Sequence, residues 1–231
     1  MKRIAWFYLF FLIFLIDLIA VAMEQPVIRY GTKPLLMVIL FLTLWSETKG
    51  IKNTLRRRLS VALFFSWLGD IFLMFESRDA LFFILGLSSF LLAHIAYIGL
   101  FFNIARREEI ADNRWLLIPV LGYYVVMMRI LTPHLGELVW PVRIYGAVIS
   151  AMLLQCLPLI RYKNKKLAFQ FVGGALLFVL SDSLLALNKF YSSFPFAGLA
   201  VLFTYGMAQY FLVNATIGYI HQKTFVRHAE N

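Results

Sequence analysis

The chain has few of the charged residues from which a soluble enzyme builds its surface. Only 15% of its 231 residues are charged and 61% are hydrophobic, whereas soluble domains average about 25% charged and about 45–50% apolar residues. The mean hydropathy is +0.78, and no polar stretch is long enough to form a separate soluble domain. The composition therefore predicts an integral membrane protein.

Cysteine and several catalytic signatures are scarce or missing. Cys156 is the one cysteine in the sequence, which excludes an intramolecular disulfide and a thiolate metal cluster. The sequence has no Walker loop, HExxH, GxSxG or Cys/His cluster. We expect no cofactor and no metal, because hard cations take about six oxygen ligands and two aspartates supply too few.

Acidic residues are outnumbered by basic ones, 12 Asp and Glu against 22 Lys and Arg, so the formal net charge is +10. In a soluble protein this excess would suggest nucleic-acid binding. Here the basic residues cluster in short loops, where they set membrane topology and meet anionic lipid headgroups. We therefore expect membrane lipid, and no nucleic acid, as a partner.

Apolar runs separated by short polar breaks predict an all-α, polytopic fold with eight transmembrane helices in one membrane domain, residues 1–231. No run alternates apolar with polar residues, as a β-barrel strand would. Lys33 and Pro34 are expected to open the second helix. The predicted spans are residues 4–23, 33–46, 59–76, 79–103, 114–132, 138–160, 167–187 and 195–220.

The first run also resembles a secretory signal peptide, because Ala20, Val21 and Ala22 have the pattern of a cleavage site. We favour a transmembrane span, since the run is long enough to cross and Asp17 interrupts its end. Basic loops follow the second, fourth and sixth spans, and both termini are basic. The positive-inside rule then predicts cytoplasmic termini, and we expect the cytoplasmic (inner) membrane of a bacterium.

Two aspartates lie inside apolar runs, Asp70 in the third and Asp182 in the seventh. A carboxylate at the centre of a transmembrane helix costs about 2.5–3.5 kcal/mol on insertion scales. Both spans run outward, so the two residues are expected at similar depth in the outer part of the membrane. They predict either a functional cavity or a hydrogen-bonded clamp between helices.

Other polar residues have two interpretations each. Lys33 and Arg143 begin inward-running spans, where they could bind a lipid phosphate, keep a carboxylate ionised, or extend their charges to the membrane surface. His94 and Gln209 are expected nearer the midplane, and His94 could be catalytic or simply a hydrogen-bonded core histidine.

A weak internal similarity suggests two parallel four-helix repeats. Residues 62–70 align with 174–182, and the Ala93–His94 pair corresponds to Ala208–Gln209. Four spans return the chain to the same side, so the repeats would be related by an axis along the membrane normal. Such a repeat would place Asp70 and Asp182 on either side of a central cavity.

The ordered set of motifs resembles the YhhN family of membrane proteins, which includes the lysoplasmalogenases. The set covers essentially the whole chain. Its motifs are Lys33-Pro34-Leu35-Leu36, Ser66-Trp67-Leu68-Gly69-Asp70, Ala93-His94-Ile95-Ala96-Tyr97, Ser181-Asp182-Ser183 and Ala208-Gln209.

The resemblance implies an eight-span hydrolase that cleaves the vinyl ether of a lysoplasmalogen, a lysophospholipid, to a fatty aldehyde and a glycerophospho-ethanolamine or -choline. It implies Asp70 and Asp182 as the catalytic pair, since enol-ether hydrolysis needs a proton donor and a carboxylate, as glycosidases do. Which aspartate is the acid stays open. The expected substrate-binding residues are Lys33, His94, Tyr97, Arg143 and Gln209.

Two other functions fit the same residues. The aspartates could form a proton relay in a non-enzymatic transporter of lipids or small molecules, or the protein could be structural with a hydrogen-bonded core. The sequence predicts no particular oligomeric state.

Overall fold

The computed structural model describes residues 2–51 and 53–229, in which helices joined by short connections occur and strands do not. The all-α prediction is therefore confirmed. The eight long helices are α1 (Lys2–Ala22), α2 (Pro26–Glu47), α3 (Thr54–Met74), α4 (Ala80–Arg107), α5 (Leu117–Leu131), α6 (Val139–Cys156), α7 (Lys165–Ala186) and α8 (Ala197–Ala229). Short helical turns extend several of them: η1 (Arg114–Leu116), η2 (Thr132–His134), η3 (Gly136–Leu138), η4 (Leu157–Arg161) and η5 (Leu187–Tyr191).

Seven of the described helices are long and apolar enough to cross a membrane. The remaining long helix, α3, has 21 residues. Its first turns contain three arginines, residues 56–58, and it also contains Asp70. These charged residues lower its mean hydropathy. Its length still matches the roughly 20 residues that a span requires. The chain is an integral membrane protein.

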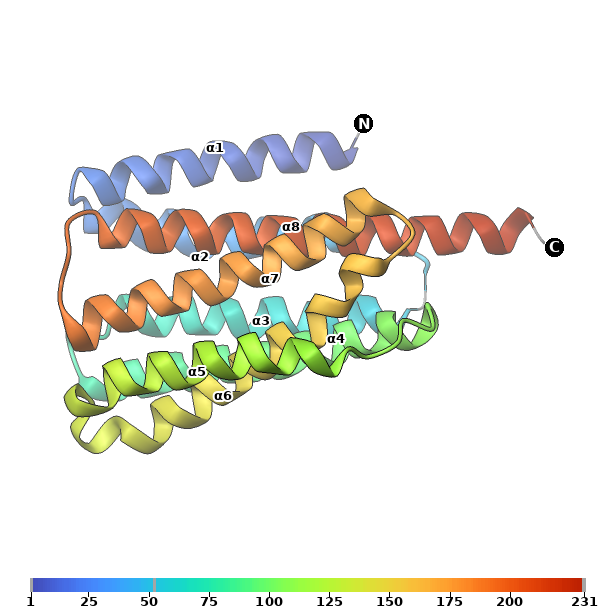
Figure 1. Cartoon of the computed structure of the whole chain (residues 1–231). Coiled ribbons are helices and arrows are strands. Elements are labelled where there is room, and N and C mark those ends of the chain that lie inside the picture. Colours follow the sequence, from blue (N-terminus) through green and yellow to red (C-terminus); the bar gives the residue numbers. More distant parts are fainter. Residues whose placement is uncertain (1, 52, 230–231) are drawn as a thin grey trace.

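The helices run side by side along one direction, and the two chain ends lie at the same end of the bundle (Figure 1). We name that end the terminal end; it also carries residues 48–51 and 53, between α2 and α3, and the connections at residues 108–113 and 162–164. The opposite, distal end carries the connections at residues 23–25, 75–79, 132–138 and 192–196. The chain thus crosses the bundle eight times.

The second helix begins earlier than its apolar run predicts. α2 starts at Pro26, in the first turn, where the missing N–H of proline needs no partner. Lys33 and Pro34 lie inside the helix, so the expectation that they open it is wrong. The additional turns bring Arg29 onto the same helix as Lys33.

Other helices also extend beyond their apolar parts. α3 begins at Thr54, where Asn53 Oδ1 accepts a hydrogen bond of 2.9 Å from the N–H of Leu55 and caps the helix. α4 continues to Arg107 and α8 to Ala229. Hydropathy detects the lipid-facing length of a helix and not its polar extensions, which explains these differences.

Close packing of α3 on α4, and of α7 on α8, holds the centre of the bundle. A Cβ at Gly69 would lie 2.6 Å from the ring of Phe90, and a Cβ at Gly174 would lie 2.8 Å from Leu212. A larger residue at either position would require the facing side chain to move, so glycine allows this close approach of the helices. Because Gly69 directly precedes Asp70, the close approach also fixes the position of that carboxyl group.

Candidate active site

Two aspartates from different halves of the chain border one cavity. Asp70 lies near the C-terminal end of α3 and Asp182 near that of α7, so both lie toward the distal end. They line a cavity of about 220 Å³ at the meeting point of α2, α3, α4, α7 and α8. We name it the polar cavity, because Arg29, Lys33 and Glu76 also line it.

The buried carboxyl of Asp70 is contacted from two other helices. Lys33 on α2 places Nζ 3.4 Å from Oδ1. Tyr205 on α8 donates a hydrogen bond of 2.8 Å to Oδ2. The Lys33 side chain is itself only 15% exposed, so little water screens its charge. Asp70 thus has one cationic partner and one neutral donor.

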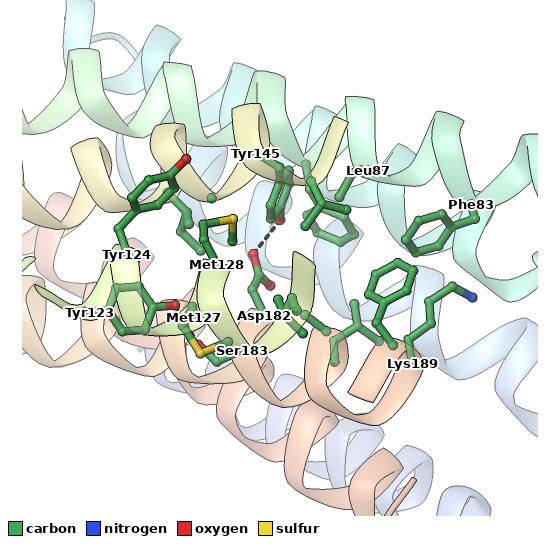
Figure 2. Close-up of a pocket in the computed structure, with 18 of the residues that line it drawn as sticks. Phe83, Leu87, Tyr123, Tyr124, Met127, Met128, Tyr145, Asp182, Ser183 and Lys189 are labelled. Carbon is green, nitrogen blue, oxygen red and sulfur yellow. Dashed lines mark hydrogen bonds between the residues drawn. The ribbon is translucent and has the colours of Figure 1, made fainter. Parts of the chain in front are cut away.

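The carboxyl of Asp182 has two ring partners instead. Tyr145 on α6 donates a hydrogen bond to Oδ2, and the two side chains point toward one another in Figure 2. His94 on α4 places Nε2 3.6 Å from the same oxygen. The structure therefore brings His94 beside one member of the predicted acid pair.

The two carboxyl environments are arranged alike. Asp70 is contacted from α2 and α8, and Asp182 from α6 and α4, which correspond if α1–α4 repeat as α5–α8. Asp70 and Asp182 are 112 residues apart (182 − 70), and so are Lys33 and Tyr145 (145 − 33). The contacts support the predicted parallel repeat, with Tyr145 in the place equivalent to Lys33.

A second cavity, of about 60 Å³, also borders Asp182 and lies between α4, α5, α6 and α7. We name it the apolar cavity, because most of its lining is hydrophobic, including Leu87, Met127 and Met128 (Figure 2). The polar and apolar cavities share Leu73, Phe90, Asp182 and Leu185. Asp182 therefore stands at the junction of a charged space and a hydrophobic one.

Tyr97 and Gln209 lie in the core, away from both cavities. Tyr97 donates a hydrogen bond of 2.5 Å to Gln209 Oε1, and Gln209 Nε2 donates one of 3.0 Å to Ser66 Oγ. The three side chains are fully buried and join α4, α8 and α3. Their geometry favours a clamp between helices over direct substrate contact.

Arg143 lies apart from the two aspartates. It lines a surface groove between α5 and α6, together with Arg129 and Trp140, and its guanidinium lies 5.6 Å from the centre of the Trp140 ring. Neither the polar nor the apolar cavity includes it. The structure thus brings together Asp70, Asp182, Lys33 and His94, and places Arg143 elsewhere.

The sequence did not single out three residues that the structure places at the site. Tyr145 and Tyr205 bind the two carboxyls, but among 11 tyrosines nothing local distinguishes them from packing residues. The spacing of 112 residues from Lys33 was the available signal for Tyr145. Arg29 lines the polar cavity, and it was missed because the apolar run of α2 begins after it.

Within the part of the chain that the structure describes, no three His, Cys, Asp or Glu side chains are grouped closely enough to hold a metal ion. The side chains nearest the two carboxyls are the lysine Lys33 at Asp70, the histidine His94 at Asp182, and a tyrosine at each. The arrangement is one of proton donors and acceptors around two carboxyls.

Comparison with known proteins gives one family over most of the chain. A sequence model of the YhhN family matches residues 28–216. The lysoplasmalogenase TMEM86B of Mus musculus is 30% identical over 182 residues, which cover 78% of this chain and 71% of the mouse protein. Its counterpart in Rattus norvegicus is 31% identical over 180 residues, 78% of this chain and 68% of the rat protein.

A bacterial relative covers a shorter part. The lysoplasmalogenase of Mycobacterium bovis is 34% identical over 113 residues, 47% of this chain and 41% of that protein. No solved structure matches the chain.

Proposed function

This chain belongs to the YhhN family, and from that premise we propose that it hydrolyses the vinyl ether bond of lysoplasmalogen-type lysophospholipids. The names of its relatives support this substrate class. The structural observation that carries the proposal is that Asp70 and Asp182 line one cavity. Two carboxyls at one cavity can supply the donor and the carboxylate that the reaction needs.

The reaction adds water across the enol ether. A carboxylic acid transfers its proton to the vinyl carbon that is remote from oxygen, and an oxocarbenium ion forms at the neighbouring carbon. A carboxylate stabilises that cation and takes a proton from the attacking water, which gives a hemiacetal. Breaking its bond to the glycerol oxygen, which regains a proton, releases a fatty aldehyde and a glycerophospho-headgroup.

The partners of the two aspartates suggest different roles for them. The ammonium of Lys33 stabilises a carboxylate at Asp70, so Asp70 acts as the ionised group. Asp182 has a phenol and an imidazole as partners and borders the apolar cavity, so it acts as the proton donor. Environments that differ in this way divide acid and base roles between paired carboxyls.

The two cavities match the two parts of a lysolipid. The hydrocarbon chain begins at Asp182 in the apolar cavity, where burial of methylene groups stabilises binding. Because that cavity is only about 60 Å³, the rest of the chain continues between apolar helices. The glycerophosphate lies in the polar cavity, near Lys33 and Arg29. The vinyl ether, which connects chain and glycerol, is then at the junction that Asp182 occupies.

The distribution of basic loops favours cytoplasmic termini in the inner membrane of a bacterium. Both cavities would then open toward the outer side of the membrane, since the aspartates lie toward the distal end. A lysolipid in the outer leaflet would reach them with its headgroup at the surface and its chain in the hydrocarbon.

The test is to incubate the purified protein with lysoplasmenylethanolamine in deuterium oxide and to trap the aldehyde as it forms. We expect fatty aldehyde with one deuterium at the carbon next to the carbonyl, and no fatty acid from acyl lysophosphatidylethanolamine. Absence of aldehyde from correctly folded protein would contradict the proposal. Proton-coupled uptake into proteoliposomes without hydrolysis would favour a transporter.

A further inference from the structure

α1 contains a fully buried aspartate that the two-carboxyl chemistry does not use. Asp17 is 0% exposed. Its Oδ1 accepts a hydrogen bond of 2.6 Å from Thr32 Oγ1 and lies 3.8 Å from Arg29 Nε. Its Oδ2 has no hydrogen-bond partner among the described residues. A carboxyl buried at such a cost in a membrane helix calls for a function, and both of its polar contacts are on α2.

Arg29 connects this aspartate to the polar cavity. It lines that cavity and also a neighbouring one of about 220 Å³, which reaches the distal surface at Pro26 and Ser77. Lys33 and Glu76 line both spaces as well. A polar path therefore leads from the distal surface, past Arg29 and Lys33, to the carboxyls of Asp70 and Asp182.

The other charges along this path already have close partners. Lys33 is 3.4 Å from Asp70, and Glu76 Oε2 is 3.0 Å from Lys189 Nζ. Arg29 is held less closely, by the 3.8 Å contact of its Nε with Asp17. That contact orients the guanidinium from the α1 side.

We propose that Arg29, positioned by Asp17, binds the phosphate of the substrate headgroup together with Lys33. This inference rests on the proposed function, because it assigns the headgroup end of the same site. Asp17 is a positioning residue in this account, since it acts through Arg29 and lines neither cavity.

The chemistry of the residues fits a phosphodiester. A guanidinium offers a planar set of donors that matches two phosphate oxygens, whereas an ammonium acts as a point charge. Arg29 and Lys33 are four residues apart on α2, so they lie on one face and about 6 Å apart along the axis. Lys33, nearer to Asp70, would meet the glycerol side of the phosphate and Arg29 the outer side.

The experiment compares a substrate that has the phosphate with one that lacks it. Arg29→Gln should raise KM for lysoplasmenylethanolamine by about 10- to 100-fold, as expected for loss of a charged hydrogen bond. It should leave KM for 1-O-alkenylglycerol, which has the vinyl ether but no phosphate, unchanged. Arg29→Lys should recover part of the loss, and Asp17→Asn should raise the same KM by a smaller factor.

Arg129→Gln is the matched control, because this exposed arginine of α5 lies in the groove outside both cavities; its KM values should stay at the wild-type level. Equal effects of Arg29→Gln on both substrates would overturn the phosphate role. A normal KM for both substrates in Asp17→Asn would overturn the positioning role.

Failure of the proposed function is distinguishable from failure of this inference. If the wild type hydrolyses neither substrate, binding of a stable alkyl-ether lysophosphatidylethanolamine still reports on the phosphate. If Arg29→Gln binds this lipid more weakly than the wild type and Arg129→Gln do, the result would support Arg29 as a phosphate-binding residue. Equal binding by all three proteins would overturn that role.

Discussion

The ammonium of Lys33 on α2 lies 3.4 Å from Oδ1 of the buried Asp70 on α3. Removing one member of a buried ion pair leaves an uncompensated charge, which destabilises a protein by about 3–5 kcal/mol. Lys33→Met should therefore lower both the melting temperature in detergent and kcat. The double variant Lys33→Met/Asp70→Asn should recover melting temperature but not activity, because the charge is then balanced while the carboxylate is gone. Recovery of activity in the double variant would contradict the role of Asp70.

Each of the two carboxyls that we propose as catalytic accepts a hydrogen bond from a tyrosine, Asp70 from Tyr205 and Asp182 from Tyr145. Tyr205→Phe and Tyr145→Phe should each lower kcat/KM by about 10-fold, the effect of losing one hydrogen bond to a charged or catalytic group. Tyr162→Phe is the control, since its hydroxyl bonds Gln222 at the terminal end. A loss in the control equal to that in the other variants would show that the effect is not specific to the carboxyls.

Gly146 on α6 lines the apolar cavity. A Cβ there would lie 3.1 Å from Met128 Cε and 3.3 Å from Tyr124 Cε2. Gly146→Leu should fill this part of the cavity and reduce kcat/KM for long-chain lysoplasmalogens more than for short-chain ones.

Gly122 on α5 provides the comparison for Gly146, because a Cβ at this exposed position would meet nothing within 4 Å. Gly122→Leu should retain the wild-type chain-length profile. The profile is measured with alkenyl chains of increasing length at one headgroup. An unchanged profile in Gly146→Leu would mean that the chain binds elsewhere.

Two linked hydrogen bonds between buried side chains, from Tyr97 to Gln209 and from Gln209 to Ser66, predict that replacing Gln209 lowers the stability of the fold. Gln209→Leu leaves two polar groups without their partner, which costs about 1–3 kcal/mol for each buried group. We expect a lower melting temperature with KM unchanged in the protein that remains folded. A selective rise in KM would instead support the sequence-based expectation that Gln209 binds substrate.

Much of the fold could be predicted because hydropathy reports directly on burial in lipid. The runs around Asp70 and Asp182 identified α3 and α7, and the cost of a carboxyl in hydrocarbon selected both residues. The helix ends were less predictable. Pro26 begins α2 and Asn53 caps α3 through local backbone hydrogen bonding, to which a hydropathy pattern is insensitive.

The partners of the two carboxyls depend on how distant helices pack. Tyr205 is 135 residues from Asp70 along the chain, so no local pattern connects them. Arg143 had the charge and the depth of a candidate, but the helix face it occupies directs it to the groove beside Trp140. Arg143 and Tyr145 are two positions apart on α6, which is about 200° of rotation around the helix axis, so the two side chains leave the helix on nearly opposite sides.

The central claim is that Asp70 and Asp182 together cleave the vinyl ether, and the most direct test is the rate of aldehyde release by Asp70→Asn and Asp182→Asn. Asparagine keeps the size of the side chain and removes its acid–base function. Asp112→Asn is the control, because that residue is exposed in the connection between α4 and α5. We predict a loss in kcat of about 10²- to 10⁴-fold in each of the first two variants and wild-type activity in the control. Full activity in both Asp70→Asn and Asp182→Asn would contradict the account.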